Sequence, residues 1–188
     1  MNQNDSLKWY QDHTAEFIAR TADVDMTLHY SRFLEQVVPG GRILDLGCGA
    51  GKASLYFTQK GYQVLAVDGC KDLCDFTRER VGCPVRHMFF EELDYTDAFD
   101  AVWACASLLH VCKADLPGIF CRIHRALKPG GVFYASFKYG EEEREKNGRL
   151  WQIPEAPAGG LTCQSDHWSG RGRRCAHPCP PLSFLPSP

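Results

Sequence analysis

Apolar positions along the chain change repeatedly between a helical period and short continuous runs, which predicts helices and strands in alternation. Helical spacing of apolar residues is found over 15–21, 26–38, 52–60, 70–81 and 115–127. Runs rich in β-branched and other apolar residues predict strands over 42–46, 62–68, 84–90, 99–107 and 132–137. Strands that alternate with helices favour a parallel sheet covered on both faces. With right-handed crossovers, the sequence predicts an α/β fold, a Rossmann-like doubly wound sheet of about five parallel strands.

The alternating pattern ends near Trp151, which divides the chain into two parts. Residues 1–151 are predicted to form one domain, with N-terminal helices in 1–38 and core βα units in 42–137. Residues 152–188 hold seven of the eleven prolines and no lysine. Such a segment buries too little apolar surface to offset its ordering entropy, so we predict disorder there. The abrupt change suggests a shifted reading frame or a truncation, which sequencing of the coding DNA of a close relative would test.

Composition limits the partners. The 188 residues carry a formal net charge of −2, which gives no attraction to phosphate backbones and argues against nucleic acid as a partner. No apolar run reaches the roughly 18 residues of a membrane span, and the first residues lack the pattern of a signal peptide. We therefore expect a cytoplasmic protein without membrane contact. Five of the ten cysteines lie in apolar or helical patterns and are predicted to be reduced, buried thiols: Cys48, Cys70, Cys74, Cys105 and Cys121.

A cluster of three glycines between Gly47 and Gly51 joins the first predicted strand to a helix. In an open α/β sheet, ligands bind outside the carboxyl ends of the strands, and glycines let them approach the backbone N–H groups there. Asp68 ends the second strand about twenty residues further on, where a carboxylate can accept both hydroxyl hydrogens of a ribose. The pattern indicates a nucleoside-containing cofactor; the alternative is a tight turn beside a solvated aspartate.

The glycine spacing separates two cofactors. The dinucleotide fingerprint needs a third glycine where Lys52 stands, which disfavours an NAD-dependent oxidoreductase but leaves it as an alternative. Asp45, two residues before Gly47, followed by the GxGxG spacing, resembles motif I of the class I S-adenosylmethionine-dependent methyltransferases. The resemblance continues to about Trp151. The segments "ACASLLH" and "SFKYGEEEREKNGR" look most like small bacterial methyltransferases of the tellurite-resistance type.

This resemblance implies S-adenosylmethionine as the cofactor and assigns residues to it. In that family the glycine loop and the ends of the second, third and fourth strands contact the cofactor, and an N-terminal aromatic residue often covers it. The matching positions here are Tyr10, Asp45, Gly47, Cys48, Gly49, Asp68, Gly69, Glu92, Leu93, Ala104 and Cys105.

The chemistry expected from this cofactor is methyl transfer to a small-molecule acceptor. Transfer from a sulfonium needs alignment and exclusion of water more than catalytic side chains. His110, just after the fourth strand, is the best-placed general base; the alternative is that it caps or packs the next helix. No Asp or Asn followed by Pro-Pro and an aromatic residue comes after the fourth strand, so a flipped nucleobase is disfavoured as substrate.

The chain departs from the family at its C-terminal part. The final antiparallel hairpin of class I methyltransferases is predicted to be missing, which would leave the fifth strand as an exposed edge and favour a homodimer. A cofactor-binding remnant without activity is therefore an alternative function. Cys163, His167, Cys175, His177 and Cys179 could supply zinc ligands, but their spacing matches no recognised finger, and we predict no metal.

Overall fold

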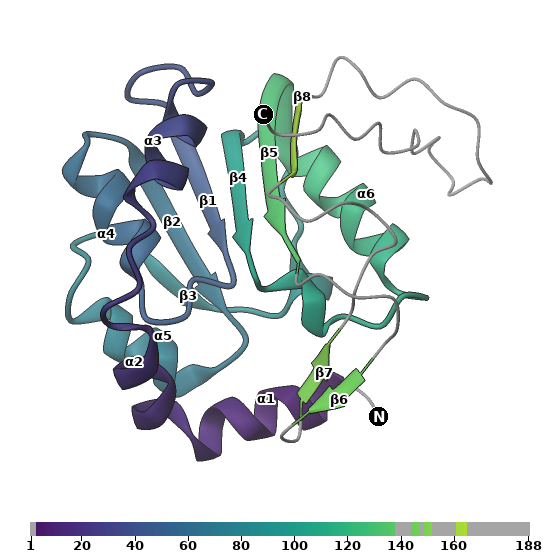
Figure 1. The fold of residues 1–188 in the computed structure, drawn as a ribbon. Coiled ribbons are helices and arrows are strands. Elements are labelled where there is room, and N and C mark those ends of the chain that lie inside the picture. The colour runs from purple at the N-terminus through teal and green to yellow at the C-terminus, as the bar shows by residue number, and fades with distance from the viewer. Residues whose placement is uncertain (1–2, 138–143, 147–148, 152–160, 165–188) are drawn as a thin grey trace.

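The computed structural model describes residues 3–137, 144–146, 149–151 and 161–164, and shows strands and helices in alternation (Figure 1). The helices are α1 (Gln3–Asp12), α2 (Thr14–Thr21), α3 (Thr27–Leu34), α4 (Lys52–Gln59), α5 (Lys71–Arg78) and α6 (Leu116–Ala126). Two short 3₁₀ helices are η1 (Phe90–Glu92) and η2 (Leu108–His110). The strands are β1 (Arg42–Leu46), β2 (Gln63–Asp68), β3 (Val85–His87), β4 (Phe99–Cys105), β5 (Leu127–Ser136), β6 (Arg144–Lys146), β7 (Arg149–Trp151) and β8 (Leu161–Gln164).

The main sheet has the strand order β3-β2-β1-β4-β5-β8. All four pairings among the first five strands are parallel, which confirms the predicted five-stranded parallel sheet of a Rossmann-like fold. The order reverses between β1 and β4, so the carboxyl ends of these two strands flank the switch point where such folds bind ligands. In Figure 1 these ends point toward α1 and α2.

The sixth strand corrects the sequence analysis. β8 pairs antiparallel with β5, in a register that runs from Val132 opposite Gln164 to Ala135 opposite Leu161. The expected exposed edge at the fifth strand is therefore wrong, and with it the reason given for a homodimer. Sheet pairing uses backbone N–H and C=O groups, so a four-residue strand inside a proline-rich stretch leaves little trace in side-chain pattern. The rest of the predicted tail, with His167, Cys175, His177 and Cys179, lies outside the described residues.

A second, two-stranded sheet is formed by β6 and β7, which pair antiparallel and stand apart from the main sheet. β7 packs against α1 and against the η2 turn. This hairpin therefore lies beside the carboxyl edge of the main sheet, on the same side as α1 (Figure 1).

Successive residues of each strand point to opposite sides of the main sheet. Helices cover both sides, so both faces of the sheet are buried. One core cluster joins alternate residues such as Ile43 and Trp103 to Tyr30 and Phe33 of α3 and Phe57 of α4. The opposite cluster joins the intervening strand residues to α6 and to the two 3₁₀ turns. The result is a three-layer domain whose rigid sheet positions the loops at its carboxyl edge.

The N-terminal region holds three helices where the apolar pattern predicts two. The additional helix, α1, has a largely polar sequence, and only Ser6 among its described side chains is fully buried. Its packing partners are α2, α5 and β7, of which only α5 also packs on the main sheet. A helix that packs at an edge in this way needs few apolar residues, so its period is weak in the sequence.

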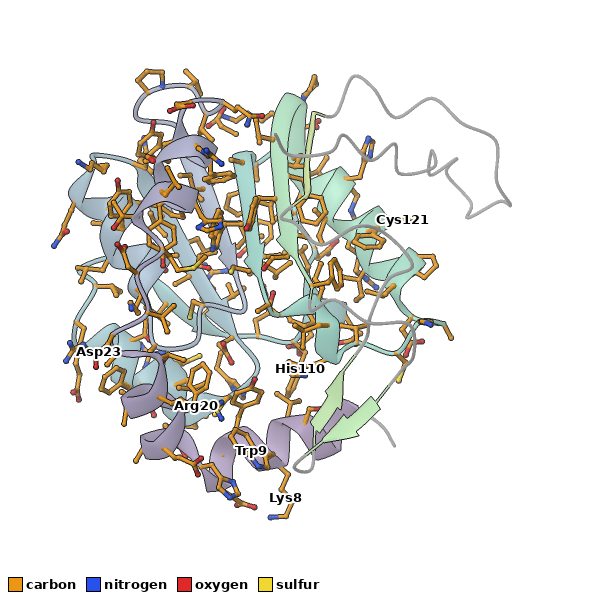
Figure 2. All side chains as sticks on the ribbon, viewed as in Figure 1. Lys8, Trp9, Arg20, Asp23, His110 and Cys121 are labelled. Carbon is orange, nitrogen blue, oxygen red and sulfur yellow. The ribbon has the colours of Figure 1, made fainter. Side chains whose placement is uncertain are left out.

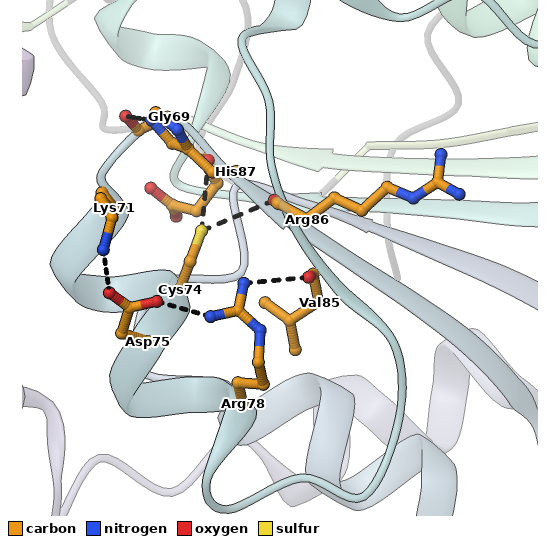
Figure 3. A network of polar contacts seen from close by, with 9 residues as sticks. Gly69, Lys71, Cys74, Asp75, Arg78, Val85, Arg86 and His87 are labelled. Atoms are coloured by element: carbon orange, nitrogen blue, oxygen red, sulfur yellow. Dashed lines mark hydrogen bonds and ion pairs between the residues drawn. The ribbon is translucent and has the colours of Figure 1, made fainter.

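A polar network fixes the carboxyl end of β2 against α5 and β3 (Figure 3). The Cys74 thiol donates to the carbonyl oxygens of Asp68 and Arg86 at 3.4 and 3.5 Å. Arg78 bonds Asp75 and also donates to the Val85 carbonyl at 3.2 Å. These contacts hold the loop after Asp68 in a defined position relative to the sheet.

Two further expectations concern cysteines and membranes. The seven cysteines between 48 and 121 are free thiols, of which Cys48, Cys70 and Cys74 are buried and Cys105 and Cys121 are half-buried. Among the described residues, no helix is long and apolar enough to cross a bilayer.

Candidate functional site

The glycine loop after β1 is built around backbone conformations that other residues avoid. Gly47 and Gly51 have φ angles of +82° and +75°, in the left-handed region. A Cβ atom on Gly47 would lie 2.3 Å from Cβ of Ser107, and one on Gly51 would lie 2.5 Å from Cγ2 of Thr77. Glycine is therefore required at both positions by conformation and by space. The loop is also tied to β2, because the N–H groups of Gly47 and Cys48 both donate to the Val67 carbonyl at 2.9 Å.

Asp68 stands where β2 ends and is bonded to this loop. One carboxylate oxygen accepts the N–H of Gly49 at 2.8 Å, and the other accepts the N–H of Cys70 at 2.8 Å. Burial raises the pKa of Asp68 above its usual range, and these backbone N–H groups counteract part of the effect. A carboxylate offers about four acceptor positions, and the Gly69 N–H also acts on Asp68, so part of its acceptor capacity stays available for a ligand.

A cavity of about 670 Å³ lies at the carboxyl edge of the sheet, between the strand ends and the α1–α2 segment. Nine of the twelve predicted site residues line it: Tyr10, Asp45, Gly47, Cys48, Gly49, Asp68, Gly69, Cys105 and His110. The structure thus brings together residues that are spread over one hundred positions of sequence.

Three predicted residues do not line the cavity. Leu93 and Ala104 are fully buried in the core cluster on the α6 side of the sheet. Glu92 uses its carboxylate to accept the N–H of Phe89 at 2.7 Å, which caps the η1 turn. The neighbouring rings of Phe89 and Phe90 reach the cavity at this end.

Asp45 is a buried carboxyl group on the floor of the cavity. It is 2% exposed, and its carboxylate accepts the hydroxyl of Ser54 at 2.6 Å. Burial first, and then the charge of Asp68, raise the pKa of Asp45 to about 7. Asp45 therefore changes charge near neutral pH inside the cavity, unlike an exposed aspartate.

His110 and Tyr10 meet at the opposite wall of the cavity. Nε2 of His110 lies 2.9 Å from the Tyr10 hydroxyl, and the two rings form an edge contact at 5.4 Å. His110 is buried on η2, directly above α1, as Figure 2 shows. The pair closes the cavity between α1 and the end of β4.

Several cavity residues were missed by sequence reasoning. The Phe17 ring lies over Gly49, since a Cβ atom on Gly49 would be 3.2 Å from Cε1 of Phe17. Ser107 donates its hydroxyl to the Leu46 carbonyl at 2.7 Å. Lys52 lines the cavity and bonds backbone carbonyls near the end of α2. Among these residues, only Phe17 belongs to a sequence pattern, the helical spacing of apolar residues. Such spacing predicts packing in general rather than a site.

The donor set fits S-adenosylmethionine. The remaining acceptor capacity of Asp68 suits a ribose hydroxyl group, and the side-chain-free glycine loop leaves room beside it. Phe89 and Phe90 offer apolar surface of the kind that a nucleobase requires. The cavity volume falls within the range of small-molecule sites.

Comparison with known proteins agrees with this site. A family model described as a methyltransferase domain matches residues 44–135. The uncharacterized methyltransferase sll0829 of Synechocystis sp. is 33% identical over 101 residues, which cover 52% of this chain and 47% of that protein. Phosphoethanolamine N-methyltransferase 1 of Zea mays is 34% identical over 101 residues, or 50% of this chain and 20% of that enzyme. The chain thus spans about half the length of the Synechocystis relative and a fifth of the maize enzyme.

The fold is also shared with solved structures. The 1,6-didemethyltoxoflavin-N1-methyltransferase of Burkholderia thailandensis, crystallised with 1,6-didemethyltoxoflavin and S-adenosylhomocysteine, superimposes with a TM-score of 0.64. The match covers 81% of this chain and 70% of that one, at 23% identity, and so shows the likeness of the folds. From the glycine loop, the strand order and the family match over 44–135, this chain belongs to the class I S-adenosylmethionine-dependent methyltransferases.

Proposed function

We propose that this chain transfers the methyl group of S-adenosylmethionine to a small-molecule acceptor. The observation that carries the proposal is one cavity that joins a nucleoside site to a proton acceptor. The glycine loop and Asp68 form its nucleoside side, and the Tyr10–His110 pair lies on its wall. A turn that only connects β1 to α4 would not need such a pair.

In this proposal the bound cofactor supplies an activated sulfonium methyl group. Asp68 holds the ribose through its remaining acceptor capacity, while the backbone of the glycine loop sets how deep the ligand lies. The α1–α2 segment covers the cavity and excludes water. Orientation and exclusion of water are the main contributions that this chemistry asks of a protein.

His110 is the proposed general base. An acceptor hydroxyl or ammonium group must lose a proton as it is methylated, and a neutral imidazole can take up that proton at Nε2. The Tyr10 hydroxyl lies 2.9 Å from this atom, so it can hold the ring in place or pass the proton to it.

The named relatives support a small acceptor but not one compound. The maize relative is named for phosphoethanolamine, and the Burkholderia structure contains 1,6-didemethyltoxoflavin. Sites grafted on one fold serve different substrates, so the acceptor is proposed only as a small molecule with an ionisable O–H or N–H group. The absence of a nucleic-acid partner and the cytoplasmic location stay predictions of the sequence.

Calorimetric titration tests the cofactor first. Purified full-length chain is titrated with S-adenosylhomocysteine and, in parallel, with NAD. Micromolar binding of the first ligand alone supports the proposal, whereas binding of NAD alone would favour the oxidoreductase.

Methyl transfer is tested next, with labelled S-adenosylmethionine and fractionated small-molecule extract. Label that moves into an extract fraction with the wild-type chain, and far more slowly with His110→Asn, supports the assigned roles. Cofactor binding without transfer to any fraction would instead support the binding remnant.

A further inference from the structure

Lys52 makes three hydrogen bonds that join the glycine loop to the cover of the cavity. Its ammonium group lies 2.9, 2.8 and 2.5 Å from the carbonyl oxygens of Thr21, Ala22 and Val24. Lys52 itself is the first residue of α4, directly after Gly51. The contact therefore joins the glycine loop, which would hold the cofactor, to the end of α2, which covers the cavity.

Helix stability does not explain this lysine. A positive charge at a helix N-terminus is unfavourable, because the backbone N–H groups there already carry partial positive charge. The first turn of α4 contains no acidic residue to compensate. One acceptor belongs to Thr21, the last residue of α2, and the other two belong to Ala22 and Val24 in the turn that follows. The contact therefore joins the start of α4 to the end of α2 and the turn after it.

Lys52 is not available as an anion ligand in this arrangement. An ammonium group has three N–H donors, and three carbonyl oxygens lie within hydrogen-bond distance of Nζ. A role as the partner of a cofactor carboxylate would require these bonds to break. The contacts therefore favour a role in holding α2 in place.

The segment that Lys52 holds forms one wall of the cavity. Phe17, Arg20, Thr21 and Val24 all line the cavity and come from α2 or the turn after it. Phe17 lies over Gly49, so the segment touches the glycine loop at its middle as well as at its end. Figure 2 labels Arg20 and Asp23 on this segment. Opening of the segment would expose the bound nucleoside to solvent.

We propose that Lys52 is a positioning residue that keeps α2 closed over the cofactor cavity and so slows release of the cofactor. This inference rests on the proposed function for its ligand. The closure itself concerns only contacts between residues of the chain. The two parts can therefore be tested separately.

The first test measures closure without any ligand. Arg20 is an exposed trypsin site in the last turn of α2, and cleavage after it requires that turn to open. In the full-length chain, Lys52→Met should speed the appearance of the fragment that begins at Thr21 by roughly fivefold. Lys52→Arg, which keeps donors for the carbonyl groups, should stay near the wild-type rate.

A matched control uses the same substitution at the other end of α4. Lys60 lies over the Tyr56 ring, away from the cavity, so Lys60→Met should leave cleavage after Arg20 unchanged. The thermal midpoints of all variants show whether an effect comes from general unfolding. A faster cut after Arg20 with an unchanged midpoint is specific to α2.

The second test measures S-adenosylhomocysteine by stopped-flow dissociation and calorimetry. Lys52→Met should dissociate the ligand roughly tenfold faster and weaken its affinity to a similar extent. Equal cleavage and equal dissociation for Lys52→Met and the wild type would overturn the inference. If the wild type bound no S-adenosylhomocysteine, the proposed function and the role in cofactor release would both fall, while the cleavage comparison would still decide whether Lys52 holds α2.

Discussion

The Tyr10 hydroxyl and Nε2 of His110 lie 2.9 Å apart, although one hundred residues separate them in the chain. Tyr10 belongs to α1, which packs outside the main sheet, and His110 belongs to the turn that follows β4. One hydrogen bond therefore joins the cover of the cavity to the strand end where the acceptor is proposed to bind. Its removal should affect both the stability of the cover and the proposed chemistry.

Substitution at this pair separates catalysis from packing. We expect His110→Asn to lower the rate of methyl transfer by about a hundredfold, the usual contribution of a general base. The affinity for S-adenosylhomocysteine should change little, because the proposed ribose site is at Asp68. Single-turnover transfer and calorimetry measure the two quantities. A similar loss in both would indicate a packing role for His110.

Tyr10→Phe keeps the ring but removes the hydroxyl group. Loss of the bond to His110 should lower the free energy of unfolding by about 1 kcal/mol. Urea denaturation measures this change. Tyr56→Phe is the control, since Tyr56 does not line the cavity, although its ring packs on Tyr30, which does. If both variants lost the same stability, the Tyr10–His110 bond would contribute nothing specific.

Asp68 should carry a large share of cofactor affinity. Replacement by Ala removes charge-assisted hydrogen bonds to the ribose and should weaken binding of S-adenosylhomocysteine by roughly 1.5 to 3 kcal/mol. Asp68→Asn keeps the shape but aims an NH2 donor at a backbone N–H of the loop, so it should also weaken binding. Glu79→Gln, an exposed change at the end of α5, is the control. Unchanged affinity in Asp68→Ala would mean that the ribose is held elsewhere.

The sequence carried enough information for the sheet and for the side of the site built from strand ends. The GxGxG spacing and Asp68 are local signals, because the turn conformation and the strand end are fixed by neighbours in sequence. Contacts such as Phe17 over Gly49 or Lys52 on the Thr21 carbonyl depend on how α2 packs, which no spacing records. Glu92 illustrates the converse, since its carboxylate caps the Phe89 N–H and so serves the local turn.

The same reasoning explains the missed strand. β8 has four residues and pairs with β5 through its backbone. A composition rich in proline around it predicts disorder, and pairing with an existing edge requires no apolar period.

Gly47 should be intolerant of any side chain. Gly47→Ala adds a Cβ atom 2.3 Å from Cβ of Ser107 and forces alanine to a φ angle of +82°. We expect a loss of more than about 2 kcal/mol in the free energy of unfolding, measured by urea denaturation. Gly61→Ala is a close control, because its φ angle is +86° but nothing lies within 4 Å of the added atom. Gly61→Ala should lower the free energy of unfolding only by the cost of placing alanine at a positive φ angle, about 1 to 2 kcal/mol. Equal losses at the two positions would show that Ser107 moves away without cost.

The buried Asp45 predicts a pH dependence of stability. Its pKa rises from 3.8 to about 7 on folding, chiefly through burial, so between these values the folded state binds more protons than the unfolded state. The contribution of Asp45 to the free energy of unfolding is then most favourable below about pH 4 and falls as the pH rises toward 7. The full effect amounts to about 4 kcal/mol at most.

Asp45→Asn isolates this contribution. The amide keeps an acceptor for the Ser54 hydroxyl but does not titrate, so the decline in unfolding free energy from pH 4 to pH 7 should be smaller than in the wild type. Asp100→Asn provides the contrast, because burial at Asp100 is outweighed by the Arg42 N–H and by Lys128, and its pKa lies below the usual range. The contribution of Asp100 to the free energy of unfolding changes below pH 4. The slope of this free energy from pH 4 to pH 7 should therefore be the same in Asp100→Asn and in the wild type. Parallel curves for Asp45→Asn and the wild type across that range would show that Asp45 is already ionised in the folded chain at pH 4, and that water reaches the floor of the cavity.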